Sequence, residues 1–239
     1  GFDQYLDVNS FVDFVIINEI ARNVDGYRLS TYFYKDKDSE NTKLHAGPVW
    51  DFNIALGNAN YCNGDATYGW AIDFNDACPG DYWQISFWWN RMWDSPVFRQ
   101  KVQARWYELR ASTFSDEAIN GMVDSLFLEV EDAQVRNFER WPILDFWVWP
   151  NSYCCGAWQQ HANYMETWLH DRIAWLDGAM PGIYVGIYDT AEYFAPKVYP
   201  NPNNGQMTFD YYARHGGLVQ LEIFDAAGRQ TDYYQQNVY

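Results

Sequence analysis

The sequence contains no run of about 18 or more consecutive apolar residues, so it predicts no membrane-spanning helix. It is also poor in cations: 16 Lys and Arg residues stand against 32 Asp and Glu residues, which gives a net charge of −16. A field of that sign repels phosphate backbones, so nucleic acid is not an expected partner. The four histidines are scattered and no Cys-x-x-Cys pair occurs, so no zinc site is predicted.

Apolar and aromatic residues are plentiful. Of the 239 residues, 48% are hydrophobic, which is enough for one large domain, or one domain and a small second one, with a real core. Aromatic residues make up 20%, a load typical of extracellular or carbohydrate-associated proteins. The net negative charge also repels ATP, so a nucleotide site in this chain would need local Lys or Arg residues or a metal ion.

Four cysteines offer two interpretations. Cys62 and Cys78 bracket a polar loop rich in Gly and Asp, which favours a disulfide in a secreted protein. Cys154 and Cys155 are adjacent, and because a vicinal bond is strained, each is expected to have another partner. The alternative is four buried free thiols in a cytosolic protein.

Hydrophobic periodicity and cap residues predict several helices and one short hairpin. A helix is expected over residues 7–23, capped by Asn9 or Ser10 and ended near Gly26. Residues 29–34 and 43–49 are predicted to be the two strands of a hairpin. Residues 58–81 form a long acidic loop, and such loops tend to be functional or covalently fixed. Further helices are expected over residues 82–93, 97–111, 115–138 and 158–176, with the last stopping at Asp177-Gly178.

Several side chains receive structural interpretations from their spacing. Glu19 lies on the opposite side of its helix from Ile16 and Ile20, so it is expected on a solvated face. The acidic loop does not match the spacing of an EF-hand, so its carboxylates are expected to be solvated: Asp65, Asp73, Asp76 and Asp81. Five tryptophans at helical spacing are expected in the core: Trp88, Trp89, Trp93, Trp106 and Trp175. Trp147 and Trp149 are less regular and are expected to be exposed.

Two aspartates stand in short segments flanked by Gly or aromatic residues. Asp25 lies in Asn-Val-Asp-Gly-Tyr-Arg at residues 23–28, and Asp51 lies in Trp-Asp-Phe-Asn at residues 50–53. A carboxylate near an attacking hydroxyl and another on a metal ion, at the edges of a hairpin, are the parts of many phosphoryl-transfer sites. Aspartates are also common in turns, where they bond to their own backbone. The residues alone leave both interpretations open.

Together with other motifs along residues 7–177, these two segments resemble the CotH family of secreted, atypical protein kinases. The resemblance covers about three quarters of the chain and is carried by residues 7–13, 17–20, 23–34, 47–53 (Gly-Pro-Val-Trp-Asp-Phe-Asn), 55–58, 137–143 and 168–177. It implies transfer of the ATP γ-phosphoryl group to Ser or Thr of a protein substrate. It also implies a helix-rich, kinase-like C-terminal lobe whose N-terminal lobe would precede Gly1.

Site residues follow from the resemblance, position by position. Asp25 would be the catalytic residue that orients the substrate hydroxyl, and Asp51 would bind Mg²⁺ or Mn²⁺. Asn53 would assist at the metal, where the family has a second Asp. Three residues would contact the cofactor: Asn23, Arg28 and Ser30. Ser30 stands where the family has Asn, and both departures weaken the metal site.

Other roles remain open for some of these residues. Arg28 is as often a surface ion-pair residue as a phosphate ligand. Asn58 and Asn60 flank the metal motif and are candidates for substrate or metal contact. The alternative function is a catalytically inactive structural or adhesive surface protein that binds a protein or a glycan. An acidic, aromatic surface also makes self-assembly an option.

The residue pattern of the sequence changes after residue 182. Residues 206–212 and 218–224 alternate like β-strands, and residues 225–228 are predicted to form a tight turn. The segment resembles the type IX secretion C-terminal sorting domain of Bacteroidetes, a small β-sandwich, through residues 198–202, 205, 221–225 and 228–229. We therefore expect an α+β chain: a kinase-like domain over residues 1–182, a partial sorting domain over residues 183–239, and a secreted or cell-surface location.

Overall fold

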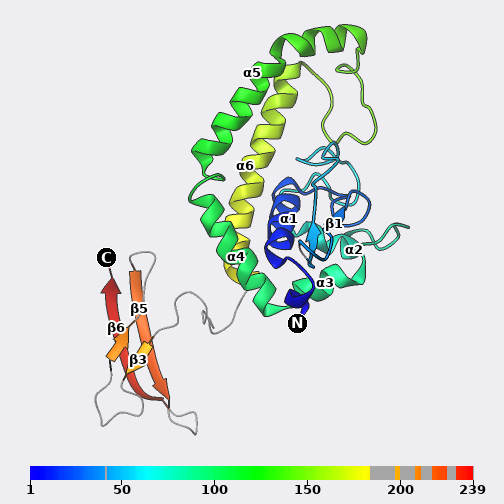
Figure 1. Ribbon diagram of the computed structural model, residues 1–239. Helices are drawn as coiled ribbons and strands as arrows, with labels where there is room; N and C mark the ends of the chain where they lie inside the picture. Colours follow the sequence, from blue (N-terminus) through cyan, green and yellow to red (C-terminus); the bar gives the residue numbers. More distant parts are fainter. Residues whose placement is uncertain (41, 184–196, 200–207, 211–216, 225–229, 239) are drawn as a thin grey trace. The chain divides into compact units, whose positions relative to one another are not determined.

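A computed structural model describes the chain except residues 41, 184–196, 200–207, 211–216, 225–229 and 239 (Figure 1). Two compact units are present, Gly1–Val185 and Gly186–Tyr239. The first unit contains the helices α1 (Val8–Ala21), α2 (Phe74–Ala77), α3 (Phe87–Trp93), α4 (Pro96–Arg110), α5 (Asp116–Arg140) and α6 (Trp158–Ile183). It also holds the 3-10 helices η1 (Phe2–Gln4) and η2 (Ala71–Asp73) and the strands β1 (Phe33–Lys35) and β2 (Leu44–Ala46). The predicted α+β class is confirmed. No helix among the described residues is long and apolar enough to span a membrane.

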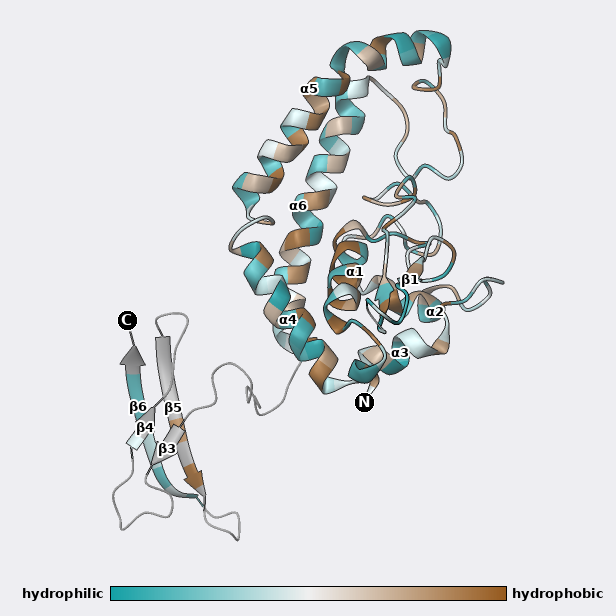
Figure 2. Cartoon of the chain, in the orientation of Figure 1, coloured by the Kyte–Doolittle hydropathy of each residue, from teal (hydrophilic) through white to brown (hydrophobic). Residues whose placement is uncertain are grey.

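Helix α1 lies at the centre of the first unit. Asp7 caps it, because its carboxylate accepts a hydrogen bond from the Ser10 backbone N–H at 2.9 Å. The helix packs against α4, α6, η2 and β2 and is hydrophobic along most of its length (Figure 2). Phe11, Val15 and Ile16 are at most 1% exposed. Only Asn9 and Asp13 of this helix are exposed, so polar residues on its other sides, Asn18 and Glu19 among them, are buried.

The hairpin is shorter than the sequence predicts. β1 pairs antiparallel with β2 in the register Phe33 opposite Ala46 and Lys35 opposite Leu44. The residues before β1 form turns instead, because the backbone N–H groups of Arg28 and Ser30 both donate to the Asp25 carbonyl. The β1 strand can begin only where these turn hydrogen bonds end.

Tertiary contacts move two other helix boundaries. α3 begins at Phe87, later than expected, since the Asn75 amide bonds both the N–H and the C=O of Ile85 and holds the preceding segment extended. α6 continues past Asp177-Gly178 to Ile183, so the predicted stop there is wrong. Gln103 of α4 donates to the Met180 carbonyl at 2.9 Å, and Trp106 donates to Asp177. Packing on α4 therefore carries α6 beyond a sequence that locally favours an end.

Both pairs of cysteines are disulfide-bonded. The predicted Cys62–Cys78 bridge is confirmed. Cys154 and Cys155 are bonded to each other, so the expectation of separate partners is wrong, and so is the alternative of four free thiols.

The tryptophans follow the expected division. Trp89 and Trp106 are at most 1% exposed, and Trp88, Trp93 and Trp175 pack against the same core while partly buried. Trp147 and Trp149 are exposed, as predicted.

The second unit contains antiparallel strand pairs. β3 (Lys197–Tyr199) pairs with β4 (Thr208–Asp210), and β5 (Gly217–Phe224) pairs with β6 (Gln230–Val238). The strand expected at residues 218–224 is confirmed as β5, and β4 lies within the one expected at residues 206–212. The turn predicted at residues 225–228 lies outside the described residues.

Candidate functional site

Asp25 lies in a tight turn that follows α1. Arg22 ends the helix in the left-handed region, and the Asn23 side-chain oxygen then accepts a hydrogen bond from the Asp25 N–H at 3.2 Å. Gly26 is required here, because a Cβ atom at this position would meet the Asn18 side-chain oxygen at 2.0 Å. The turn thus fixes the Asp25 backbone against the end of the central helix.

Asn23 also brings the second aspartate to this turn. Its side-chain N–H donates to the backbone carbonyl of Asp51 at 3.2 Å. Asp51 itself adopts a left-handed conformation, with φ of 61°, and its residue is exposed. In the described part of the chain, its carboxylate has no hydrogen bond or ion pair. One amide therefore joins the backbones of the two predicted site residues and leaves the Asp51 carboxylate free.

Arg28 holds the Asp25 carboxylate from the other side. Its guanidinium forms an ion pair with Asp25 at 2.7 Å and with Asp81 at 2.9 Å, and it also donates to the carbonyls of Val24 and Trp83. The Arg28 side chain is only 4% exposed. The ion-pair interpretation of Arg28 therefore describes its placement, although the ion pair is partly buried rather than on the surface.

The charges of these groups act on one another. Burial raises the pKa of Asp25 most, the Arg28 cation lowers it, and the negative charges of Asp51 and Asp81 raise it further. Burial also raises the pKa of Tyr61, with a further contribution from Asp25. Two carboxylates thus share the Arg28 cation, Asp51 adds a third negative charge beside them, and the site carries an excess of negative charge.

The remaining predicted residues make fewer contacts with the Asp25 turn. Ser30 is buried, and its backbone N–H bonds to the Asp25 carbonyl at 2.9 Å. Asn53 is exposed, and its carbonyl accepts a hydrogen bond from the Asn58 side chain at 3.0 Å. Asn60 donates its backbone N–H to Pro150. The turn thus gathers Asn23, Asp25, Arg28 and Asp51, whereas no hydrogen bond among the described residues ties the Asn53 side chain to them.

Asp81 is a site residue that the sequence interpretation missed. It was expected to be solvated, yet it is an ion-pair partner of Arg28, and it also accepts from the Trp83 N–H at 2.7 Å. One of its oxygens lies within 4.8 Å of the sulfur atoms of Cys62 and Cys78. The sequence feature that could have indicated this role is the predicted Cys62–Cys78 disulfide, because it holds the loop next to Asp81.

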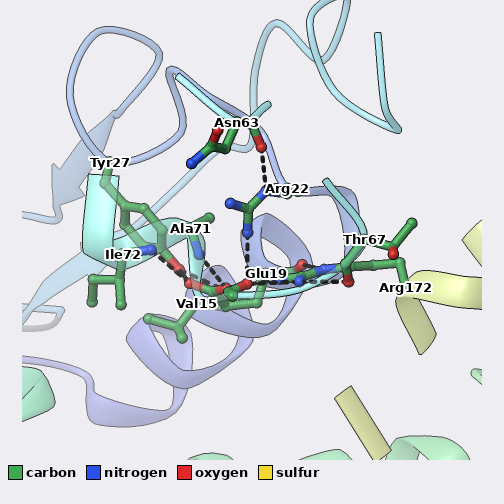
Figure 3. Close-up of polar contacts among 10 residues, drawn as sticks. Val15, Glu19, Arg22, Tyr27, Asn63, Thr67, Ala71, Ile72 and Arg172 are labelled. Carbon is green, nitrogen blue, oxygen red and sulfur yellow. Dashed lines mark hydrogen bonds and ion pairs between the residues drawn. The ribbon is translucent and has the colours of Figure 1, made fainter. Parts of the chain in front are cut away.

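A second polar cluster, the Glu19–Arg172 network, lies inside the protein (Figure 3). Glu19 is 1% exposed, so its predicted solvated position is wrong. One of its carboxylate oxygens accepts from the Tyr27 hydroxyl and the Ile72 N–H, each at 3.0 Å. The other accepts from the Ala71 N–H at 2.7 Å and from Arg172 at 3.2 Å. Every lone pair that burial removes from water is thereby compensated.

Two arginines extend the network into the long loop. Arg172, 0% exposed, donates to the carbonyls of Glu19, Thr67 and Gly69, and burial lowers its pKa to about 10. Arg22 donates to the carbonyls of Asn63 and Gly69. The loop over residues 63–72 is therefore bound to α1 and α6, which also fixes the start of the Asp25 turn.

Comparison with known proteins gives one family. The family model described as CotH kinase protein matches residues 1–176. Neither the curated proteins nor the solved structures contain a match to the chain.

Proposed function

Because the chain belongs to the CotH kinase protein family, we propose that it transfers the γ-phosphoryl group of ATP to a Ser or Thr hydroxyl of a protein substrate. Asp25 orients the hydroxyl and accepts its proton, and Asp51 is the principal ligand of a divalent cation. The observation that carries this proposal is the joining of the two segments by Asn23, which bonds both the Asp25 N–H and the Asp51 carbonyl.

Asp25 has the chemistry of a general base in this position. Its raised pKa makes the carboxylate a stronger proton acceptor than a solvated aspartate. Arg28 holds the carboxylate at 2.7 Å, which limits its rotation, and so positions the other carboxylate oxygen. In this proposal Arg28 acts through Asp25, because its guanidinium nitrogens already bond four protein groups.

The oxygen donors suit a hard cation such as Mg²⁺ or Mn²⁺. Asp51 offers an exposed carboxylate that has no partner among the described residues, and Asn53 offers a neutral amide oxygen two residues later. When bound, the cation would neutralise charge on the nucleotide phosphates. It would also relieve the repulsion between Asp51 and Asp25 that raises the Asp25 pKa. Ser30 would supply at most one further oxygen from its buried position.

The roles of the two aspartates can be separated by experiment. Transfer of labelled phosphate from ATP to casein, or to the protein itself, would be measured with Mn²⁺ and with Mg²⁺. Asp25→Asn is expected to lower the transfer rate about 10²- to 10⁴-fold, as for loss of a general base, while leaving nucleotide binding unchanged. Asp132→Asn, at an exposed position of α5, is the matched control. Equal transfer by Asp25→Asn and the wild type would refute the assigned role of Asp25.

A non-catalytic protein is the second candidate. Asn53 and Ser30 carry no charge where the family has stronger ligands, and the described cations near Asp25 are already paired. A structural or adhesive role would follow if the intact protein bound no nucleotide with either metal.

We also propose that the protein works outside the cell, on the surface or in secreted form. Two disulfides and no free cysteine favour an oxidising compartment. The resemblance of residues 198–229 to a type IX sorting domain supports the same location. Fractionation of cells that express the full protein would test it, and recovery only from the reduced cytosol would contradict it.

A further inference from the structure

A pocket of about 290 Å³ lies next to the segment that follows Asp51. Four parts of the chain line it: the loop over residues 52–58, residues 151–153, Phe127 of α5, and residues 158–165 of α6. Its walls are tied together, because the Tyr164 hydroxyl donates to the Gly57 carbonyl at 3.2 Å and Asn60 donates to Pro150. At this size, near the lower end for small-molecule sites, the pocket suits one compact ligand unit.

One wall of the pocket is aromatic. The rings of Tyr153 and Tyr164 stack with centroids 4.7 Å apart, and His161 meets the edge of Tyr153 at 4.9 Å. Phe52 and Trp158 add further ring surface. Because Tyr164 already covers one face of Tyr153, a flat base cannot enter between these two rings.

The polar groups of the pocket are side-chain amides. Among the described residues, the side chains of Asn53 and Asn151 form no hydrogen bond, and Asn58 uses only its N–H group. The Nε2 atom of His161 is buried in the same wall and also has no partner in the described part of the chain. Each amide presents both a donor and an acceptor, as a hydroxyl group does.

No charged side chain lines the pocket within the described residues, although the whole chain carries a net charge of −16. A phosphate, carboxylate or ammonium group would enter without a counter-charge, which is costly in a partly buried site. The ligand that fits is therefore neutral, with an apolar face and several hydroxyl groups.

We propose that this pocket binds a neutral monosaccharide unit, free or as part of a glycan. The C–H face of the sugar ring packs on the aromatic wall, and the hydroxyl groups bond the amides of Asn58 and Asn151. The proposal does not depend on phosphoryl transfer. It assigns a binding site to aromatic residues on α6 and on the loop before it, outside the Asp25 turn.

The test is direct titration of the full chain with glucose, galactose, mannose and N-acetylglucosamine, followed by saturation-transfer NMR. Two variants change the pocket: Tyr153→Leu removes the ring, and Asn151→Ala removes an amide without touching a hydrogen bond of its side chain. Their matched controls are Tyr82→Leu, at a residue 86% exposed, and Asn90→Ala, on exposed positions outside the pocket. Thermal unfolding of each variant verifies that it is folded.

The expected result is saturable binding of at least one neutral sugar. Tyr153→Leu and Asn151→Ala should each weaken binding about tenfold, which corresponds to the loss of one good contact, and the controls should not change it. The proposal is overturned if no sugar saturates the wild-type protein. It is equally overturned if adenosine binds instead and is weakened by the same two variants, because the pocket would then be a nucleoside site.

Discussion

The protein contains two acid–arginine arrangements that differ in how completely their charges are compensated. In the Glu19–Arg172 network the side chains are 1% and 0% exposed, and the carboxylate accepts four hydrogen bonds. In the Asp25 turn the Arg28 cation serves two carboxylates that are 18% and 23% exposed, while Asp51 beside them is unpaired among the described residues. The first arrangement has no capacity left for a ligand, whereas the second has an excess of negative charge.

This difference in charge compensation indicates which arrangement stabilises the fold and which one can bind a ligand. A buried carboxylate that is fully bonded within the protein stabilises the fold only while each partner is present. A partly open cluster of carboxylates with too few cations is where an added cation gains most. We therefore expect changes to the Glu19–Arg172 network to appear in stability and changes to the Asp25 turn to appear in binding and turnover.

The largest expected effect comes from breaking the buried network. Glu19→Gln leaves Arg172 charged and unpaired in the core, and loss of one partner of such a pair costs about 3–5 kcal/mol of unfolding free energy. Urea unfolding would measure it. Glu108→Gln is the control, since Glu108 is 63% exposed and pairs with Arg105 at the surface. Similar stabilities for the two variants would show that the network contributes little.

Removal of the Cys62–Cys78 bridge should have the next largest effect. The bridge closes a loop of 16 residues, and a bridge of that span contributes about 3 kcal/mol in the chain-entropy model. The double variant Cys62→Ser/Cys78→Ser is expected to lose about that amount in urea unfolding. It should also lower transfer activity, because Asp81 lies beside the bridge and holds Arg28. Full activity in the destabilised variant would contradict this link between loop and site.

Local features of this fold could be predicted from the sequence, but long-range partners could not. The apolar pattern predicted α1 to within about two residues of its ends, although the helix is capped by Asp7 and not by Asn9 or Ser10 as predicted. Loop composition predicted the Cys62–Cys78 bridge. Glu19 was misplaced because its partner Arg172 lies 153 residues away and the exposed side of α1 is the one that carries Asn9 and Asp13. Similarly, Asp81 was interpreted from its own acidic loop, whereas its position depends on Arg28.

The same limit applied to the candidate site. The family resemblance predicted Asp25 and Asp51 as site residues, but the sequence did not show that the Asn23 side chain joins their backbones. The hairpin ended shorter than predicted because hydrogen bonds to the Asp25 carbonyl extend the turn. The residues after Asp25 therefore follow the hydrogen bonds of the turn rather than their strand propensity.

Arg28→Met tests the other half of the comparison, because it removes the cation of the Asp25 turn. The variant leaves Asp25 and Asp81 without their shared cation, so we expect a loss of about 1–3 kcal/mol in stability, less than for Glu19→Gln. The pKa of Asp25 should rise further, since the Arg28 charge now lowers it. Transfer activity should therefore require a higher pH. A pH–rate profile identical to that of the wild type would contradict the positioning role of Arg28.

The smallest expected effect concerns His161, a partly buried residue whose Nε2 atom has no hydrogen-bond partner among the described residues. Burial lowers the pKa of His161 below its ordinary value of about 6.5. The unfolded chain then binds the proton more readily, so this stabilising contribution is present above about pH 6.5 and is lost as the pH falls through the folded pKa. Urea unfolding of the wild type and His161→Gln at pH 7.5 and pH 5.5 should show a slightly larger acid loss for the wild type. Equal losses would mean that His161 is protonated alike in both states.

The most direct test of the central claim is calorimetric titration of ATP into the intact protein, with and without Mg²⁺ or Mn²⁺. We predict metal-dependent binding by the wild type and a loss of about tenfold or more in Asp51→Asn, because the principal charged ligand is gone. Asp94→Asn, which changes an exposed aspartate at the end of α3, should bind like the wild type. Absence of binding by the wild type, or equal binding by Asp51→Asn, would contradict the account.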